Sequence, residues 1–214
     1  MKRLIGVEEA LANFFASGPL ALGPKLGPIL WQFPPSFRFD GERLESFFRL
    51  LPRTTAEAAR LAAGHDRRVK DPCVEVERAM PLRHAIEIRH ESFETPDFIA
   101  LLRRHGIALV VADTVDYPYL EDVTADFVYA RLHGSERLYV SGYDARALAA
   151  WARRVKLWAA GRETGGRHRV GAPFAGDTES RDVYVYFDND AKVRAPYDAM
   201  ALARRLGPTV SGSG

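Results

Sequence analysis

The stretch HAIEIRHESFETPDFIALLRRHGIALVVAD, residues 84–113, decides the fold of this chain. It contains a short apolar strand at 84–89, a helix at 96–105 and a second apolar strand at 107–113. Strands that alternate with helices are typical of a parallel sheet whose helices cover its faces. The stretch therefore predicts an α/β fold.

The same alternation continues on both sides of this stretch. Further strands are predicted at 29–32, 126–132 and 182–188, and further helices at 1–17, 42–51, 56–64, 144–160 and 195–206. Asp40 and the pair Thr54 and Thr55 are expected to cap the helices that follow them. The irregular stretch around Cys73 has room for a short strand, and only a short turn fits between Asp113 and Asp126. We predict one domain over residues 1–207 and a disordered tail over 208–214.

The composition excludes several classes of protein. The 214 residues carry 30 basic and 28 acidic side chains, a formal net charge of +2, and no block of like charges, so a nucleic-acid or membrane surface is not indicated. No apolar run approaches the roughly 20 residues that span a bilayer. Cys73 is the only cysteine, which excludes an intrachain disulfide and a zinc site built on cysteines. A cytoplasmic protein fits these features best.

The glycine-rich stretch GRETGGRHRVGAP at 161–173 is a poor candidate for a phosphate-binding loop. It lacks the Lys-Ser/Thr ending of such a loop, and in a barrel it lies on the face opposite the active site. The sequence contains no motif for an organic cofactor.

Polar side chains stand at the ends of the predicted strands, where parallel α/β enzymes keep their chemistry. Strand alternation in a barrel directs one set of them to the interior, near one mouth. This set is Gln32, Glu87, Arg89, Asp113, Tyr129, Arg131 and His133. Buried charges need compensation, and two acids can face two arginines here. A purely structural network of ion pairs is the alternative to a functional site.

At these residues the chain resembles the YecE-like proteins, uncharacterised TIM barrels of domain-of-unknown-function family seventy-two. The matching segments are LGPKLGPILWQFPPSF at 22–37, LRHAIEIRHESF at 82–93, ADT at 112–114, YARLHG at 129–134 and DVYVYFDNDAKVRAPYDAMAL at 182–202. They span nearly the whole chain in the family's order, which makes the resemblance specific.

The resemblance implies a TIM (β/α)8-type barrel in which three strands precede the first helix of this chain. Five strands here and three absent ones make eight, so we expect a truncated version that lacks the family's N-terminal third. The motif positions that carry over are Gln32, Glu87, Arg89, Asp113, Arg131, His133, Gly134 and Asn189. Asp188 departs from the pattern, because the family tends to have asparagine there.

The two arginines of this set favour an anionic ligand. Arg89 and Arg131 can each clamp a carboxylate or a phosphate in a bidentate manner. The other predicted substrate-binding residues are Gln32, Tyr129 and Asn189. The candidates for proton transfer are Glu87, Asp113 and His133. Our leading hypothesis is an enzyme that acts on a small anionic metabolite by acid–base chemistry, as a hydrolase or an isomerase.

Two other functions remain open. The three candidates for proton transfer could instead hold a divalent metal ion, as in a metal-dependent phosphodiesterase or nuclease, although the nearby arginines would compete for the carboxylates. The third hypothesis is a non-catalytic binding protein. The sequence predicts neither the substrate nor the oligomeric state.

Overall fold

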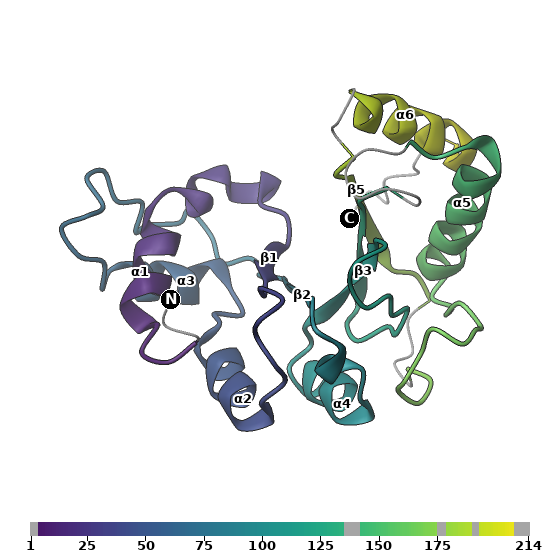
Figure 1. The fold of residues 1–214 in the computed structure, drawn as a ribbon. Coiled ribbons are helices and arrows are strands. Elements are labelled where there is room, and N and C mark those ends of the chain that lie inside the picture. Colours follow the sequence, from purple (N-terminus) through teal and green to yellow (C-terminus); the bar gives the residue numbers. More distant parts are fainter. Residues whose placement is uncertain (1–3, 135–141, 175–178, 190–192, 208–214) are drawn as a thin grey trace. The chain divides into compact units, whose positions relative to one another are not determined.

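A computed structural model of the chain describes residues 4–134, 142–174, 179–189 and 193–207 (Figure 1). The strands in these ranges are hydrogen-bonded in the order β1-β2-β3-β4-β5, which is also their order along the chain. They are β1 (Ile29–Gln32), β2 (His84–Glu87), β3 (Ala108–Asp113), β4 (Phe127–Leu132) and β5 (Asp182–Phe187). The predicted α/β class is confirmed.

The chain separates into two compact units. Unit 1 comprises Met1–Trp31 and Phe39–Ala85, and unit 2 comprises Gln32–Arg38 and Ile86–Gly214. Each unit contains its own cluster of buried apolar side chains. One domain over 1–207 stays a prediction, and the tail predicted at 208–214 lies outside the described residues.

Unit 1 is mainly helical. Its helices are α1 (Glu8–Ala16), the 3-10 helix η1 (Pro19–Lys25), α2 (Gly41–Leu50) and α3 (Thr55–Ala62). The Asp40 carboxylate accepts a hydrogen bond from the Arg43 N–H at 3.0 Å, and the Thr54 hydroxyl accepts one from the Glu57 N–H at 3.1 Å. These bonds satisfy N–H groups that a helix start leaves without partners, so the predicted caps of α2 and α3 are confirmed.

Unit 2 packs helices against one face of its strands. The helices are η2 (Glu91–Phe93), α4 (Pro96–Arg104), α5 (Ala145–Ala159) and α6 (Arg194–Leu206). β3, β4 and β5 are parallel neighbours. Val128, Ala130 and Leu132 of β4 belong to a buried cluster that includes Trp151 of α5 and Leu202 of α6. Because side chains alternate along a strand, the remaining residues of β4 point to the opposite face.

A short connection joins β3 to β4. Residues 114–126 contain no helix, as the sequence predicted. The Thr124 hydroxyl donates to the Ile107 carbonyl and accepts from the Leu109 N–H, both at 2.7 Å. This buried side chain thereby fixes the end of the connection against the start of β3.

The predicted bounds of helices and strands agree with the structure to within two residues, apart from the first helix and the stretch around Cys73. The first helix begins at Glu8, because Leu4 and Gly6 have φ values of 66° and 59°, outside the right-handed helical region. The strand predicted at 84–89 ends two residues earlier, at Glu87, which is within this limit. The described residues around Cys73 form no strand, since the Cys73 N–H donates to the Ala16 carbonyl at the end of α1 (2.8 Å).

Within the described ranges, no helix combines the length and the apolar character that crossing a bilayer requires.

Candidate functional site

Glu87, the last residue of β2, is the centre of a polar cluster in unit 2. Only 1% of its side chain is exposed. Its Oε1 atom accepts hydrogen bonds from Gln32 Nε2 at 2.7 Å and from Arg89 Nε at 3.1 Å. Its Oε2 atom accepts a hydrogen bond from Arg131 Nη1. Both carboxylate oxygens are therefore engaged, and each is engaged by at least one guanidinium group.

Arg131 links this carboxylate to a second acid. Its Nη2 atom donates to Asp188 Oδ2, just beyond the end of β5. The His133 ring lies close to both acids, with Nδ1 3.2 Å from Asp188 Oδ2 and Nε2 3.9 Å from Glu87 Oε2. We call the six residues together the Glu87 cluster: Gln32, Glu87, Arg89, Arg131, His133 and Asp188.

The strand ladder explains how the sequence brings these side chains together. Arg131 lies opposite Ala112 of β3 and Tyr186 of β5, so it projects from the face that the helices leave uncovered. The ladder continues past the strand ends, because the His133 N–H donates to the Asp113 carbonyl at 3.0 Å and the Asp188 N–H donates to the Leu132 carbonyl at 2.9 Å. These backbone bonds hold the residues after β4 and β5 in register.

Burial and charge set the protonation states in the cluster. Burial alone would raise the pKa of Glu87, but the hydrogen bond and charge of Arg131 outweigh it, so the pKa lies below the ordinary value. Burial and the charge of Arg131 lower the pKa of His133, and they outweigh the opposing effects of Glu87 and Asp188. Near neutral pH, Glu87 is therefore ionised and His133 is neutral.

The prediction that Asp113 joins this cluster is wrong. Asp113 lies opposite Leu132 in the sheet, and Leu132 belongs to the apolar cluster under the helices. The Trp151 indole of α5 donates to Asp113 Oδ2 at 3.0 Å. The sequence correctly grouped Asp113 with Leu109 and Val111 by parity, but that parity belongs to the face under the helices.

Asn189 is buried in a different set of hydrogen bonds. Its Nδ2 atom donates to Asp198 Oδ2 of α6 at 2.9 Å, and the same oxygen accepts the Tyr143 N–H at 3.0 Å. The Tyr143 hydroxyl in turn accepts the Gly134 N–H at 3.1 Å. Asn189 thus helps to tie the ends of β4 and β5 to the helices, and its role in substrate binding stays a prediction.

Tyr129 and Arg89 contact aromatic rings beside the cluster. The Tyr129 ring stacks on Tyr186, with centroids 4.9 Å apart and an interplanar angle of 22°. The Arg89 guanidinium lies over the Tyr117 ring, 4.7 Å from its centroid. Burial and the neighbouring Tyr186 raise the pKa of Tyr129 to about 12, so this phenol is neutral near pH 7.

Sequence reasoning missed the place of Asp188 in the cluster. In the sequence, Asp188 stands out only as a departure from a family pattern. The signal that could have found it is its position, as the last residue of the strand predicted at 182–188 and in parity with Tyr184 and Tyr186. Tyr186 pairs with Arg131 in the parallel sheet, so residues of β5 with the parity of Tyr186 lie on the same face as Arg131.

The position of Asp113 outside the Glu87 cluster also affects the metal-binding hypothesis. The set Glu87, Asp113 and His133 is not assembled, because Asp113 faces the helices. Among the described residues, no group of three or more His, Cys, Asp or Glu side chains is arranged to hold a metal ion.

The glycine-rich stretch at 161–173 is held by a carboxylate. Asp122 Oδ2 accepts the Val170 N–H at 3.0 Å, and Asp122 Oδ1 accepts the Gly171 N–H at 2.9 Å. A Cβ atom on Gly171 would lie 2.6 Å from the Ile99 side chain, so only glycine fits there. These two N–H groups are occupied by the chain's own acid, which disfavours a phosphate at this position.

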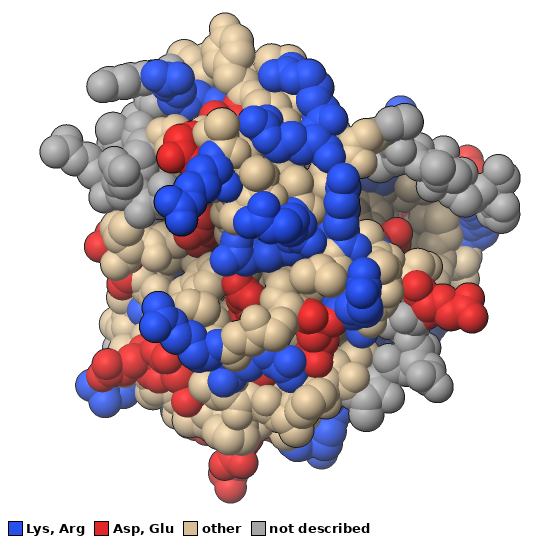
Figure 2. Space-filling model, turned by 90° about the vertical axis from the view of Figure 1, so that its right-hand side faces the viewer, with Lys and Arg blue, Asp and Glu red and all other residues tan. Residues whose placement is uncertain are grey.

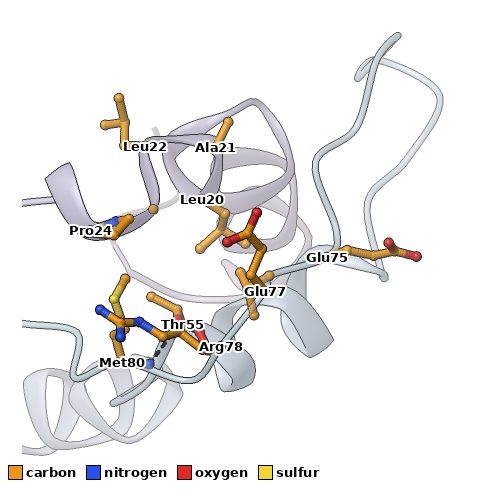
Figure 3. Close-up of a pocket in the computed structure, with 11 residues that line it drawn as sticks. Leu20, Ala21, Leu22, Pro24, Thr55, Glu75, Glu77, Arg78 and Met80 are labelled. Carbon is orange, nitrogen blue, oxygen red and sulfur yellow. Dashed lines mark hydrogen bonds between the residues drawn. The ribbon is translucent and has the colours of Figure 1, made fainter.

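A separate pocket of about 290 Å³ lies within unit 1 (Figure 3). Residues of η1, among them Leu20 and Pro24, line one side, and Glu77, Arg78 and Met80 line the other. None of the predicted site residues lines it.

Basic side chains gather on α5, on the side of unit 2 that Figure 2 shows. α5 contains Arg146, Arg153, Arg154 and Lys156 and no acid. Arg146, Arg153 and Lys156 are exposed, whereas Trp151 packs towards the sheet. This basic surface therefore faces away from the Glu87 cluster.

Comparisons with known proteins support the fold. A family model described as "Protein of unknown function DUF72" matches residues 1–213. A DUF72 family protein from Thermotoga maritima has a similar structure, with a TM-score of 0.64 and 22% identity over 94% of this chain and 65% of that one. A DUF72 family protein from Enterococcus faecalis gives a TM-score of 0.66 and 19% identity over 97% of this chain and 68% of that one. The chain thus spans about two thirds of the length of these structures. No curated protein matches it.

Proposed function

Since this chain belongs to the DUF72 family of proteins of unknown function, we propose a function from its site: an enzyme that acts on a small anionic molecule by acid–base chemistry. The observation that carries the proposal is the Glu87 cluster. There an ionised carboxylate, two guanidinium groups and a neutral imidazole meet at positions that are 1% to 15% exposed. Buried titratable groups with shifted pKa values are characteristic of functional sites.

We further propose that the sheet is part of a (β/α)8-type barrel. Sequential order of the strands and the parallel pairing of β3, β4 and β5 support this assignment. In such a barrel the active site lies at the carboxyl ends of the strands, which is where Glu87, His133 and Asp188 stand. The unpaired thiol of Cys73 is consistent with work in the reducing cytoplasm.

His133 is the group that we expect to move the proton. A neutral imidazole accepts a proton at one nitrogen while the other nitrogen is oriented by a carboxylate. Asp188 lies nearer to Nδ1 than Glu87 does to Nε2, at 3.2 Å against 3.9 Å. We therefore propose that Asp188 favours the tautomer protonated at Nδ1 and that Nε2 exchanges the proton with the substrate.

Arg131 is the group that we expect to bind the substrate's negative charge. Its two acidic partners differ in accessibility, because 33% of the Asp188 side chain is exposed but only 1% of the Glu87 side chain. A carboxylate or phosphate of the substrate would therefore replace Asp188 at Arg131 more readily than it would replace Glu87. Guanidinium groups bind both anions in a bidentate manner.

The decisive experiment compares Arg131 variants. Arg131→Ala should abolish the binding of small carboxylates and phosphates, measured by isothermal titration calorimetry, while circular dichroism shows that the fold persists. Arg131→Lys keeps the positive charge beside Glu87 and serves as the second variant if Arg131→Ala unfolds. It should bind these anions weakly, because an ammonium group lacks the bidentate fork.

Turnover provides the second measurement. His133→Gln should remove turnover in a panel of phosphate and carboxylate esters and isomerisable acids, and it should leave anion binding intact. Anion binding that is unchanged in the Arg131 variants would overturn the binding role of Arg131. Turnover that survives in His133→Gln would overturn the proton-transfer role of His133.

A further inference from the structure

Four aromatic side chains form a ladder on the face of β4 and β5 that the helices leave uncovered. They are Phe127, Tyr129, Tyr184 and Tyr186, and we call them the aromatic ladder. Phe127 meets Tyr184 edge-on at 5.9 Å, and Tyr129 stacks on both Tyr184 and Tyr186 at 6.5 and 4.9 Å between ring centroids. The ladder therefore runs along both strands towards their carboxyl ends.

The ladder is buried at one end and exposed at the other. Phe127 is 1% exposed and Tyr129 is 6% exposed, whereas Tyr186 is 45% exposed. β5 is the last strand in the order of the described sheet. One face of the Tyr186 ring rests on Tyr129, so the exposed area of Tyr186 includes its other face. The buried Tyr129 thus holds a large exposed aromatic ring in place, and such a ring can pack against a flat partner.

The exposed ring adjoins the Glu87 cluster. Tyr186 lies directly opposite Arg131 in the sheet. Asp188 follows two residues later on the same face, about 7 Å further along the strand direction. On the other side of β4, the residue that pairs with Arg131 in the sheet is Ala112, whose side chain is small. A ligand that reaches Arg131 therefore lies within contact distance of the Tyr186 ring.

We infer that the substrate carries a planar ring beside its anionic group, and that this ring packs on Tyr186 while the anion binds at Arg131. The inference rests on the anion-binding role proposed for Arg131. Aromatic rings attract flat partners in offset-stacked or edge-on arrangements, and an aromatic pair contributes beyond the area it buries. Tyr186 is thus a residue that determines specificity, whereas the proton-transfer role belongs to His133.

Three phosphate monoesters test this inference by calorimetry with the full chain: phenyl phosphate, cyclohexyl phosphate and methyl phosphate. The wild-type protein should bind phenyl phosphate about three- to tenfold more tightly than either of the others, as one aromatic contact predicts. Tyr186→Leu, which keeps an apolar side chain but removes the ring, should bind all three alike. Tyr197→Leu is the matched control, because Tyr197 is an exposed tyrosine on α6, and it should retain the preference.

The possible outcomes distinguish the ring-binding role of Tyr186 from the anion-binding role of Arg131. Equal binding of phenyl and cyclohexyl phosphate, or a preference that persists in Tyr186→Leu, overturns the planar-ring inference while leaving the role of Arg131 intact. A phenyl preference that depends on Tyr186 but survives in Arg131→Lys and Arg131→Ala supports the ring site and overturns the anion clamp. If the wild-type protein binds none of the three esters, both proposals fail.

Discussion

At the scale of single residues, Glu87 shows how a buried charge is stabilised in this protein. Its carboxylate is buried from solvent. Hydrogen-bond donors from three separate segments therefore stabilise the negative charge: Gln32, Arg89 and Arg131. Breaking a buried ion pair by removing one partner costs more than the pair contributes, because the remaining charge is left uncompensated.

Glu87→Gln should therefore destabilise the fold strongly. The substitution keeps the size of the side chain but removes the negative charge that Arg89 and Arg131 both contact. We expect the free energy of unfolding in urea to fall by about 3–5 kcal/mol. Glu45→Gln is the control, because Glu45 pairs with Arg49 on the surface of α2, and such pairs contribute less than about 0.5 kcal/mol. Similar losses in the two variants would contradict the central role of Glu87.

His84 in unit 1 gives a prediction for pH. Its Nδ1 atom accepts the Trp31 indole N–H at 3.0 Å, and its Nε2 atom lies 2.7 Å from the Pro52 carbonyl. Burial lowers the pKa of His84 to about 4. A neutral ring suits these contacts, since a proton on Nδ1 would face the indole donor.

The contribution of His84 to stability should therefore be complete above pH 6.5, where the unfolded chain is also neutral, and should decline as the pH falls from 6.5 to about 4. The difference between the pKa of His84 in the unfolded chain, 6.5, and in the folded protein, about 4, corresponds to about 3 kcal/mol in the free energy of unfolding. Urea unfolding of the wild type and of His84→Gln between pH 7 and pH 4 measures it. The wild type should lose more stability than the variant over this interval, and parallel curves would contradict the lowered pKa.

Asp113 and Asp188 show how well the sequence can predict the face of the sheet on which a single side chain lies. Alternation grouped residues by parity without error, but parity does not say which face the helices cover. That choice depends on the packing of Trp151, which donates to Asp113. For Arg131 the predicted face agrees with the structure, because the apolar Val128, Ala130 and Leu132 alternate with Tyr129 and Arg131 along its strand.

At the scale of helices and strands, local chemistry made most bounds predictable. Asp40 and Thr54 cap α2 and α3 through their own side chains. Residues of these types predict a helix start from the sequence alone. α6 differs, because its N-cap position is Val193, with φ of 58° and no side-chain cap. Asp198 of this helix accepts hydrogen bonds from the Tyr143 N–H and from Asn189 Nδ2, but no cap residue marks where the helix starts.

The cap of α5 provides a test at this scale. The exposed Asp144 carboxylate accepts the Ala147 N–H at 2.7 Å. Asp144→Ala should lower the free energy of unfolding by about 1 kcal/mol, and Asp144→Ser should restore most of the loss because its hydroxyl can accept the same bond. Chemical unfolding followed by circular dichroism gives both values. Equal losses in the two variants would show that the carboxylate acts in some other way.

At the scale of the whole molecule, the division into two units has consequences for unfolding. The apolar cluster of unit 1 contains Phe15 and Ala58, and the cluster in unit 2 contains Val111 and Leu202. The sequence predicts one domain over residues 1–207, because its strands alternate with helices throughout, and this stays a prediction. Periodicity reports which residues are apolar but not with which other residues they cluster.

Tryptophan fluorescence can follow each unit separately. Trp31 belongs to unit 1, whereas Trp151 and Trp158 belong to unit 2. A Trp31→Phe protein therefore reports on unit 2, and a Trp151→Phe, Trp158→Phe protein reports on unit 1. We expect the urea midpoints of the two proteins to differ, because each unit buries its own apolar cluster. Coincident midpoints, with each variant matching the wild type by circular dichroism, would show that the units unfold as one.

The short connection from β3 to β4 also bears on the order in which the chain folds. Only residues 114–126 separate these strands, whereas residues 133–181 separate β4 from β5. Closing the longer loop costs about 1 kcal/mol more in chain entropy, and distant pairings generally form late. We therefore expect β5 to pair with β4 late in folding. Because β5 brings Tyr186 and Asp188 into place, the binding surface would form last.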